Sequence, residues 1–150
     1  LLCLSMSPSD DAVVSTACWD EEGDTLQNVR RIVFILGQSV PEEREIDGLD
    51  PSFIHVKVTV GGEVVGTARM NPQDGHIGRV AVLAGYRGRG LGCMLMQELH
   101  RQAHALGLDH THLSAQLTSE AFYSSLGYVR ANDRVFLDAG MEHVDMHRRV

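Results

Sequence analysis

The turn between residues 85 and 92 constrains the fold more than any other part of the sequence. It reads Gly-Tyr-Arg-Gly-Arg-Gly-Leu-Gly and joins an extended apolar run over 77–83 to a stripe of apolar residues with helical spacing over 91–106. A further extended run follows over 110–116. We therefore predict a βαβ unit with two parallel strands and a right-handed crossover, and a site at the carboxyl ends of those strands.

The rest of the chain predicts further helices and strands around this unit. Helical spacing favours helices over 26–36 and 118–126. Alternating apolar residues favour strands over 53–60 and 63–70, joined by a Gly61-Gly62 turn, and two more over 128–137 and 142–149. This order predicts an α/β (α+β layered) fold in which helices pack on one mixed, mostly antiparallel sheet.

Length, charge and cysteine content narrow the class of protein. The 150 residues suit one domain, which we place at 26–150, after a segment 1–25 that holds an edge strand or is partly flexible. A net charge of −7 argues against a nucleic-acid binder, and no apolar run approaches the roughly 20 residues of a membrane span. Three irregularly spaced cysteines argue against a disulfide framework, and the opening residues do not resemble a signal peptide. We predict a cytoplasmic protein.

The glycine-rich turn is typical of a phosphate-binding loop. Glycines leave backbone N–H groups uncovered, a helix N-terminus adds a positive dipole end, and Arg87 and Arg89 add charge. A dinucleotide fingerprint fails, because Cys93 and Leu95 stand where it requires glycine. A Walker loop fails as well, since Lys57 is the chain's only lysine. A turn that merely caps the helix is the alternative.

Two motifs in this order resemble the GNAT superfamily of acyl-CoA-dependent N-acyltransferases. The first is Arg-x-x-Gly-x-Gly at Arg87, Gly90 and Gly92, and the second is the run Phe-Tyr-Ser-Ser-Leu-Gly-Tyr over 122–128. The resemblance covers roughly 26–149 and is strongest to a bacterial-type subgroup of unassigned substrate. It implies a sheet with helices on both faces around the central βαβ unit, and acetyl-CoA as the acyl donor.

The resemblance also implies which residues hold that donor. The backbone of the strand at Val80, Ala81 and Val82 would pair with its pantetheine arm, as an added strand would. The side-chain amide of Gln116 would bond the same arm, and Phe122 would also contact the donor. The pyrophosphate would rest on the turn and the first residues of the helix, namely Arg87, Gly88, Arg89, Gly90, Leu91 and Gly92.

The resemblance further implies that Tyr123 donates a proton to the departing CoA thiolate, although many tyrosines in such positions only pack in a core. His76 is our candidate base for the amine, since imidazole titrates near neutral pH. The acids Glu42, Glu43, Glu45 and Asp47 remain open as alternatives. Arg69 and Arg79 suit an anionic group on the acceptor or structural pairing.

Eight histidines invite a metal hypothesis, but their spacing completes no ligand set and we expect no metal.

We predict an enzyme that transfers an acetyl group from acetyl-CoA directly to a primary amine of a small molecule or peptide. The resemblance makes a homodimer a candidate assembly. The alternative is a non-catalytic CoA-binding or regulatory module of the same fold.

Overall fold

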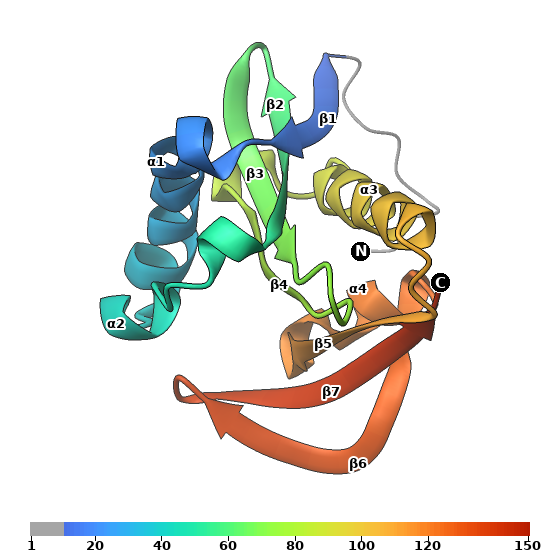
Figure 1. The fold of residues 1–150 in the computed structure, drawn as a ribbon. Helices are drawn as coiled ribbons and strands as arrows, with labels where there is room; N and C mark the ends of the chain where they lie inside the picture. Colours follow the sequence, from blue (N-terminus) through green and yellow to red (C-terminus); the bar gives the residue numbers. More distant parts are fainter. Residues whose placement is uncertain (1–10) are drawn as a thin grey trace.

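A computed structural model describes residues 11–150 of the chain. Seven strands form two sheets (Figure 1). The first sheet is antiparallel, in the order β1 (Ala12–Ala17), β2 (Ile54–Val60), β3 (Glu63–Met70) and β4 (Ile77–Val82). The second has the order β5 (His110–Gln116), β7 (Met141–Arg149) and β6 (Val129–Asp138). The predicted edge strand of the N-terminal segment is therefore β1, while residues 1–10, where we expected flexibility, lie outside the described part.

Helices cover both faces of the first sheet (Figure 1). Helix α1 (Trp19–Arg30) continues into a π-helical segment, Arg31–Leu36. Val29 of α1 and Val33 of this segment pack on Ala81 of β4. Helix α3 (Leu91–Ala105) packs its apolar stripe against the other face. The short helices α2 (Glu42–Glu45) and α4 (Glu120–Ser125) flank the opening between the two sheets. The α/β fold class, with its central βαβ unit, is confirmed.

The predicted start of the first helix at residue 26 was wrong. Helix α1 begins at Trp19, because Asp20, Glu21 and Glu22 complement the positive end of its dipole. The carboxylate of Glu22 also accepts a hydrogen bond from the backbone N–H of Cys18, at 2.9 Å. The first turns bury few apolar side chains, so the helical spacing becomes visible only from Leu26.

The two parallel strands of the βαβ unit diverge instead of pairing along their length. A single parallel bridge, between His76 and His112, joins the two sheets. There the imidazole rings stack with centroids 4.8 Å apart. Beyond the bridge, β4 and β5 separate, so the one continuous sheet expected from the sequence is a pair of sheets with an opening between them (Figure 1).

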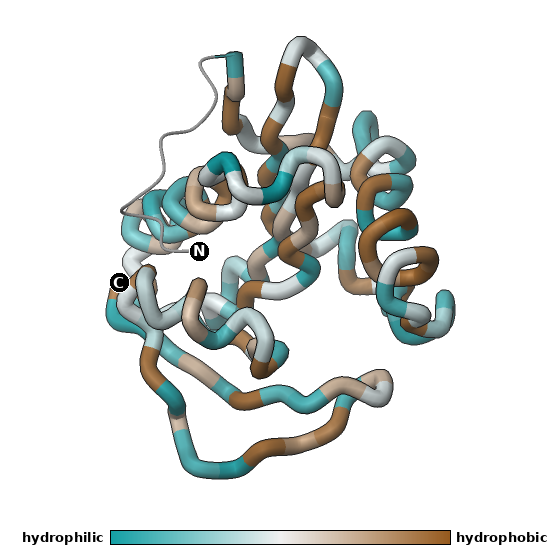
Figure 2. The backbone as a smooth tube through the Cα atoms, turned by 180° about the vertical axis from the view of Figure 1, so that it is seen from behind, coloured by the Kyte–Doolittle hydropathy of each residue, from teal (hydrophilic) through white to brown (hydrophobic). Residues whose placement is uncertain are grey.

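One hydrophobic core spans both sheets in spite of this opening. It includes Val56 and Ile77 from the first sheet, Leu95 from α3, and Leu113 and Val144 from the second. Figure 2 shows hydrophobic segments recurring along the central strands and over the π-helical segment. Side chains of α3 thus hold together two sheets that share almost no backbone hydrogen bonds.

Two of the three cysteines lie in the described region. Cys93, on the buried side of α3, is disulfide-bonded, whereas Cys18 carries an exposed free thiol. The irregular spacing of the cysteines therefore did not exclude a cross-link at Cys93.

Candidate active site

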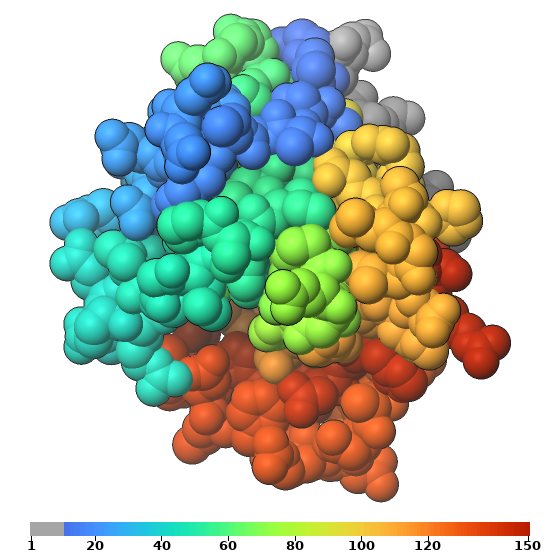
Figure 3. Space-filling model, viewed as in Figure 1, coloured from blue at the N-terminus to red at the C-terminus, as the bar shows by residue number. Residues whose placement is uncertain are grey.

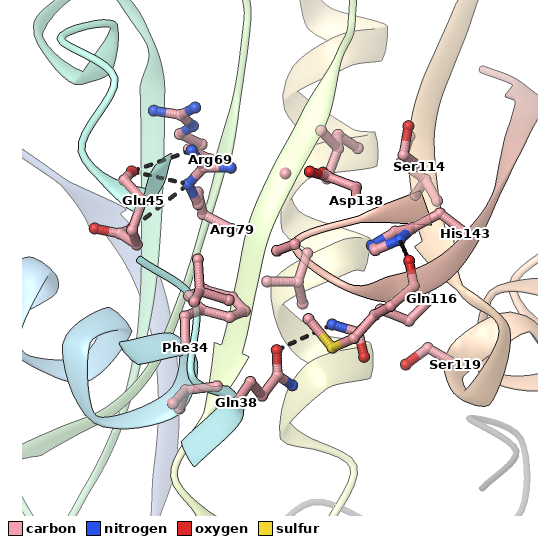
Figure 4. A pocket seen from close by; sticks show the side chains of 18 of the residues that line it. Phe34, Gln38, Glu45, Arg69, Arg79, Ser114, Gln116, Ser119, Asp138 and His143 are labelled. Atoms are coloured by element: carbon pink, nitrogen blue, oxygen red, sulfur yellow. Dashed lines mark hydrogen bonds and ion pairs between the residues drawn. The ribbon is translucent and has the colours of Figure 1, made fainter. Parts of the chain in front are cut away.

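A cavity of about 600 Å³ occupies the opening between β4 and β5. In the space-filling view it is a hollow between the segment around α2 and the β6–β7 ribbon (Figure 3). Side chains from both sheets and from the segment over 31–45, which includes the π-helical turns and α2, point into it (Figure 4). Residues from many parts of the chain line it, among them Phe34, Gln38, Arg44, Arg79, Val80, Arg87, Gln116, Tyr123, Asp138, Met141 and His143.

The edge of β4 that borders this cavity is open. Within the described residues, no strand pairs with this edge beyond the bridge at His76. Strand β4 also carries a β-bulge, because Arg79 and Val80 together lie opposite the single residue Ala68 of β3. On this edge the backbone of Val80–Val82 has no strand partner and can pair with an extended ligand, although the carbonyl of Val82 accepts a hydrogen bond from the Nε–H of Arg87.

The glycine-rich turn leads from the end of β4 into α3 and has the backbone geometry of an anion site. Gly88 and Gly90 both have φ of 78°, in the left-handed region that favours glycine. Gly90 precedes the first turn of α3, where the N–H groups of Leu91 and Gly92 have no earlier carbonyl in the helix to bond. This 15-residue helix directs its positive dipole end at the turn, so the residues fit a pyrophosphate.

The structure brings some of the predicted donor-binding residues to the cavity and places others beside it. Val80, Val82, Arg87 and Gln116 line the cavity. Ala81 faces the opposite side of the sheet and packs beneath α1, so only its backbone can serve a ligand at the open edge. The remaining predicted residues, Gly88, Arg89, Gly90, Leu91, Gly92 and Phe122, lie outside the cavity lining.

The contacts of the turn's side chains differ from our expectation of two arginines facing a phosphate. The Nε–H of Arg87 donates to the carbonyl of Val82, at 3.0 Å, and the Arg89 guanidinium lies over the ring of Tyr86. Leu91 is buried in the core. A Cβ on Gly92 would lie 3.3 Å from the ring of Phe122, so the helix and α4 approach each other closely there. The anion-binding geometry of the turn therefore resides in its backbone.

Two polar contacts cross the cavity. The side-chain amide of Gln116, on β5, donates to the amide oxygen of Gln38 at 3.0 Å (Figure 4). Arg44 of α2 forms an ion pair with Asp138, which lies at the tip of the β6–β7 ribbon and 94 residues away in the chain. Both contacts link the segment over 31–45 to the second sheet, so they define the sides of the entrance.

Tyr123 reaches the cavity from α4 and is half-buried. Burial, together with the neighbouring Tyr128, raises the pKa of the Tyr123 phenol above its ordinary range, so the phenol stays protonated at neutral pH. Within residues 11–150 its hydroxyl has no side-chain hydrogen-bond partner, whereas that of Tyr128 bonds Thr111 and His100. Tyr123 thus has a proton to donate into the cavity.

Two histidines border the cavity. Desolvation of the ring and the neighbouring His112 lower the pKa of His76, which is therefore neutral at pH 7. Arg69 and Arg79 also disfavour its protonation, and only Asp74 favours it.

His143 also points into the cavity (Figure 4), and it is one of the eight histidines that we considered above only as metal ligands. One of its ring nitrogens, Nδ1, lies 2.8 Å from the carbonyl of Met141, to which a neutral ring donates its N–H. That tautomer leaves Nε2 as an acceptor. No local motif surrounds His143, so its place in the cavity follows only from the pairing of β7 with β5, where it lies opposite Gln116.

A network of buried ion pairs forms the wall of the cavity beside α2. Arg30 of α1 is almost fully buried and donates to Glu45 at 2.5 Å and to Asp50 at 2.7 Å. Arg69 of β3 pairs with Asp47 and, at 2.9 Å, with Asp50. Arg69 is thus engaged in structural pairing, one of the two roles considered for it.

This pairing bears on the acidic residues that we left open as bases. Although burial alone would raise it, the hydrogen bonds and charge of Arg69 hold the pKa of Asp47 well below its usual range. Glu45 is buried against Arg30, and Glu42 pairs with Arg31 on the outer surface. Asp47 and Glu42 do not line the cavity, so of these acids only Glu45 borders it.

Two further features bear on the class of protein. The part of the chain that the structure describes contains no group of three or more histidine, cysteine or acidic side chains placed to hold a metal ion. Over the same residues, no helix is both long and apolar enough to cross a membrane.

Comparisons with known proteins agree with this geometry. The family described as "Acetyltransferase (GNAT) domain" matches residues 27–150. YjcF of Bacillus subtilis (strain 168), an uncharacterized N-acetyltransferase, is 37% identical over 120 residues, which cover 79% of this chain and 86% of YjcF. A crystal structure of an acyl-CoA N-acyltransferase from Pseudomonas aeruginosa is 30% identical with a TM-score of 0.81, covering 91% of this chain and 99% of that one. Escherichia coli ElaA is 27% identical with a TM-score of 0.80, at the same coverage.

Proposed function

The chain belongs to the GNAT family of acetyltransferases, and on that premise we propose that it transfers an acetyl group from acetyl-CoA directly to a primary amine of a small molecule or peptide. The observation that carries the proposal is one cavity that joins the open edge of β4 to the phenol of Tyr123 and extends to Arg87, near the start of the glycine-rich turn. The edge and the phenol serve the arm and the sulfur of a CoA thioester, and the backbone of the turn beyond Arg87 serves its pyrophosphate.

The donor supplies the acetyl group as a thioester, and residues of this chain provide the rest. The backbone of Val80–Val82 binds the pantetheine arm, and an N–H of this segment donates to the thioester oxygen as negative charge develops there. The amine nitrogen forms a bond to the acetyl carbon as the carbon–sulfur bond breaks. The amine's proton passes to the base, and Tyr123 gives its proton to the departing sulfur.

The acceptor side of the cavity carries charges of both signs. The guanidiniums of Arg44, Arg69 and Arg79 and the carboxylates of Glu45 and Asp138 line it, and Arg44 pairs with Asp138 across the entrance. Neither a purely acidic nor a purely basic lining therefore selects the amine. A cytoplasmic location and a homodimer stay predictions.

The direct test is release of free CoA thiol when the protein is given acetyl-CoA and a panel of primary amines. We expect amine-dependent thiol release and acetylated product by mass spectrometry. Binding of acetyl-CoA without release for any amine would contradict the enzyme and favour a non-catalytic CoA-binding module.

Gly90→Ala is expected to weaken acetyl-CoA binding about tenfold. A Cβ at φ 78° costs roughly 1–2 kcal/mol, and the turn relieves it by moving the N–H groups that hold the pyrophosphate. Calorimetry with acetyl-CoA measures the change. The matched control is Gly61→Ala, which places a Cβ at φ 58° in the β2–β3 turn, far from the cavity in the fold. Equal affinity in both variants would refute the pyrophosphate role of the turn.

His76→Asn is expected to lower kcat/KM about 100-fold and to remove the acid limb of its pH profile. The base must be neutral, so in the native enzyme the rate falls as the pH drops through the pKa of His76, which lies below the usual imidazole value. His143→Asn is the comparison, because it removes the other imidazole of the cavity. If His143→Asn abolishes the acid limb and His76→Asn does not, the base is His143 and our assignment is wrong.

A further inference from the structure

Arg79 has a backbone conformation that its side chain ordinarily disfavours. Its φ is 53°, in the left-handed region, at the bulge where Arg79 and Val80 lie opposite Ala68. A residue other than glycine persists in this conformation only where its surroundings hold it there. The bulge lies on the open edge of β4, beside the backbone that we assign to the acyl donor. The contacts that stabilise this conformation of Arg79 therefore also set the position of the open edge of β4.

Hydrogen bonds from the side chain of Arg79 stabilise this backbone conformation. Its Nη2 group donates to the carbonyl of Arg44 at 3.0 Å and to that of Glu45 at 3.1 Å, and its Nε–H donates to the latter at 3.2 Å (Figure 4). These carbonyls end the four-residue helix α2, whose last C=O groups have no partner within the helix. A further contact of 3.3 Å reaches the carboxylate of Asp47. The guanidinium thus contacts the segment over 44–47 through both Nε and Nη2.

We propose that Arg79 is a positioning residue that fixes α2, on the acceptor side of the cavity, to the β4 bulge, on the donor side. The guanidinium holds the left-handed backbone of the bulge from the α2 end, and the bulge in turn holds α2 near the entrance. This inference rests on the proposed function, because the bulge matters for turnover only if Val80–Val82 receive the thioester. Arg79 acts through backbone placement and does not touch the reacting atoms.

Two substitutions separate the side chain from the backbone. Arg79→Gly removes the contacts to α2 but adopts φ 53° without strain, so the bulge persists. Arg79→Ala removes the same contacts and keeps a Cβ, so the bulge relaxes. We expect both variants to raise the KM for the amine about tenfold. We expect kcat to stay within threefold of the native value in Arg79→Gly and to fall more than tenfold in Arg79→Ala.

Arg79→Lys serves as the conservative variant. It keeps a cation near the α2 carbonyls, and we expect it to recover part of the amine KM. Equal loss of kcat in the Gly and Ala variants would overturn the proposal, because the guanidinium would then act on the reactants. An unchanged amine KM in both variants would overturn it as well.

Hydrogen exchange measured without substrates tests the link between Arg79 and α2 independently of the proposed function. We expect the amides over 44–47 to exchange at least tenfold faster in both Arg79→Gly and Arg79→Ala, and those over 79–81 to do so only in Arg79→Ala. Unchanged exchange over 44–47 would overturn the proposed link, whatever the enzyme does. If exchange changes as expected while the native protein acetylates no amine, the link holds and the proposed function fails.

Discussion

Replacing Arg30 by methionine is expected to lower the free energy of unfolding by about 3–5 kcal/mol. The guanidinium is 1% exposed and bonds Glu45 and Asp50, whose carboxylates are also buried. Methionine fills a similar length but leaves Glu45 with only the 3.5 Å contact to Arg79, and leaves Asp50 with Arg69 as its remaining guanidinium partner. Urea denaturation followed by circular dichroism measures the loss.

The matched control for this prediction is Arg101→Met. Arg101 pairs with Glu98 on the exposed face of α3, and an exposed pair contributes about 0–1 kcal/mol. If Arg30→Met costs no more than Arg101→Met, the buried network does not stabilise the fold.

The network of buried ion pairs also makes the free energy of unfolding depend on pH. Although burial opposes it, the hydrogen bonds and charges of Arg30 and Arg69 lower the pKa of Asp50 in the folded state. The stabilisation is therefore complete above the unfolded pKa and is lost as the pH falls through the folded pKa.

Tyr123→Phe is expected to lower kcat about 100-fold while the Kd of acetyl-CoA stays within twofold of the native value. The phenol is protonated and half-buried at the cavity, and its loss leaves the departing thiolate without a proton donor. Thiol release gives kcat and calorimetry gives Kd.

Tyr128→Phe is the matched control, because it removes a hydroxyl that bonds Thr111 and His100 in the core. It should lower the free energy of unfolding by roughly 1–2 kcal/mol and leave kcat unchanged. A Tyr123→Phe enzyme with native turnover would exclude Tyr123 from the mechanism.

The strongest periodic segments were predictable because local burial dictates them. Strand β5 has the predicted bounds, and α3 ends one residue before the predicted position, ahead of Gly107. The start of α1 was not predictable from apolar spacing. The first turns of Trp19–Arg30 are stabilised by acidic residues at the helix N-terminus, and only the later turns bury apolar side chains. The separation of β4 from β5 leaves no local mark in the sequence, because an isolated strand does not reveal which of its edges is paired.

The same distinction between local and long-range determinants applies to the residues of the site. Arg87 and Tyr123 lie in compact motifs, and Gln116 ends the strongly predicted strand β5. The structure brings all three to the cavity. His143 and the ion pair of Arg44 with Asp138 depend on the pairing of β5, β6 and β7, so their spacing in the chain carries no signal. The positive φ of Arg79 depends on the register between β3 and β4, which alternating apolar residues do not specify.

The single bridge at His76 has a consequence for the cost of admitting a ligand. A molecule that wedges between β4 and β5 breaks no ladder of interstrand bonds, because none exists beyond the bridge. Cooperative unfolding of the domain depends instead on the side chains of α3, which belong to the same apolar core as both sheets. The two sheets can therefore separate between β4 and β5 to admit an extended ligand, and the domain still unfolds as one cooperative unit.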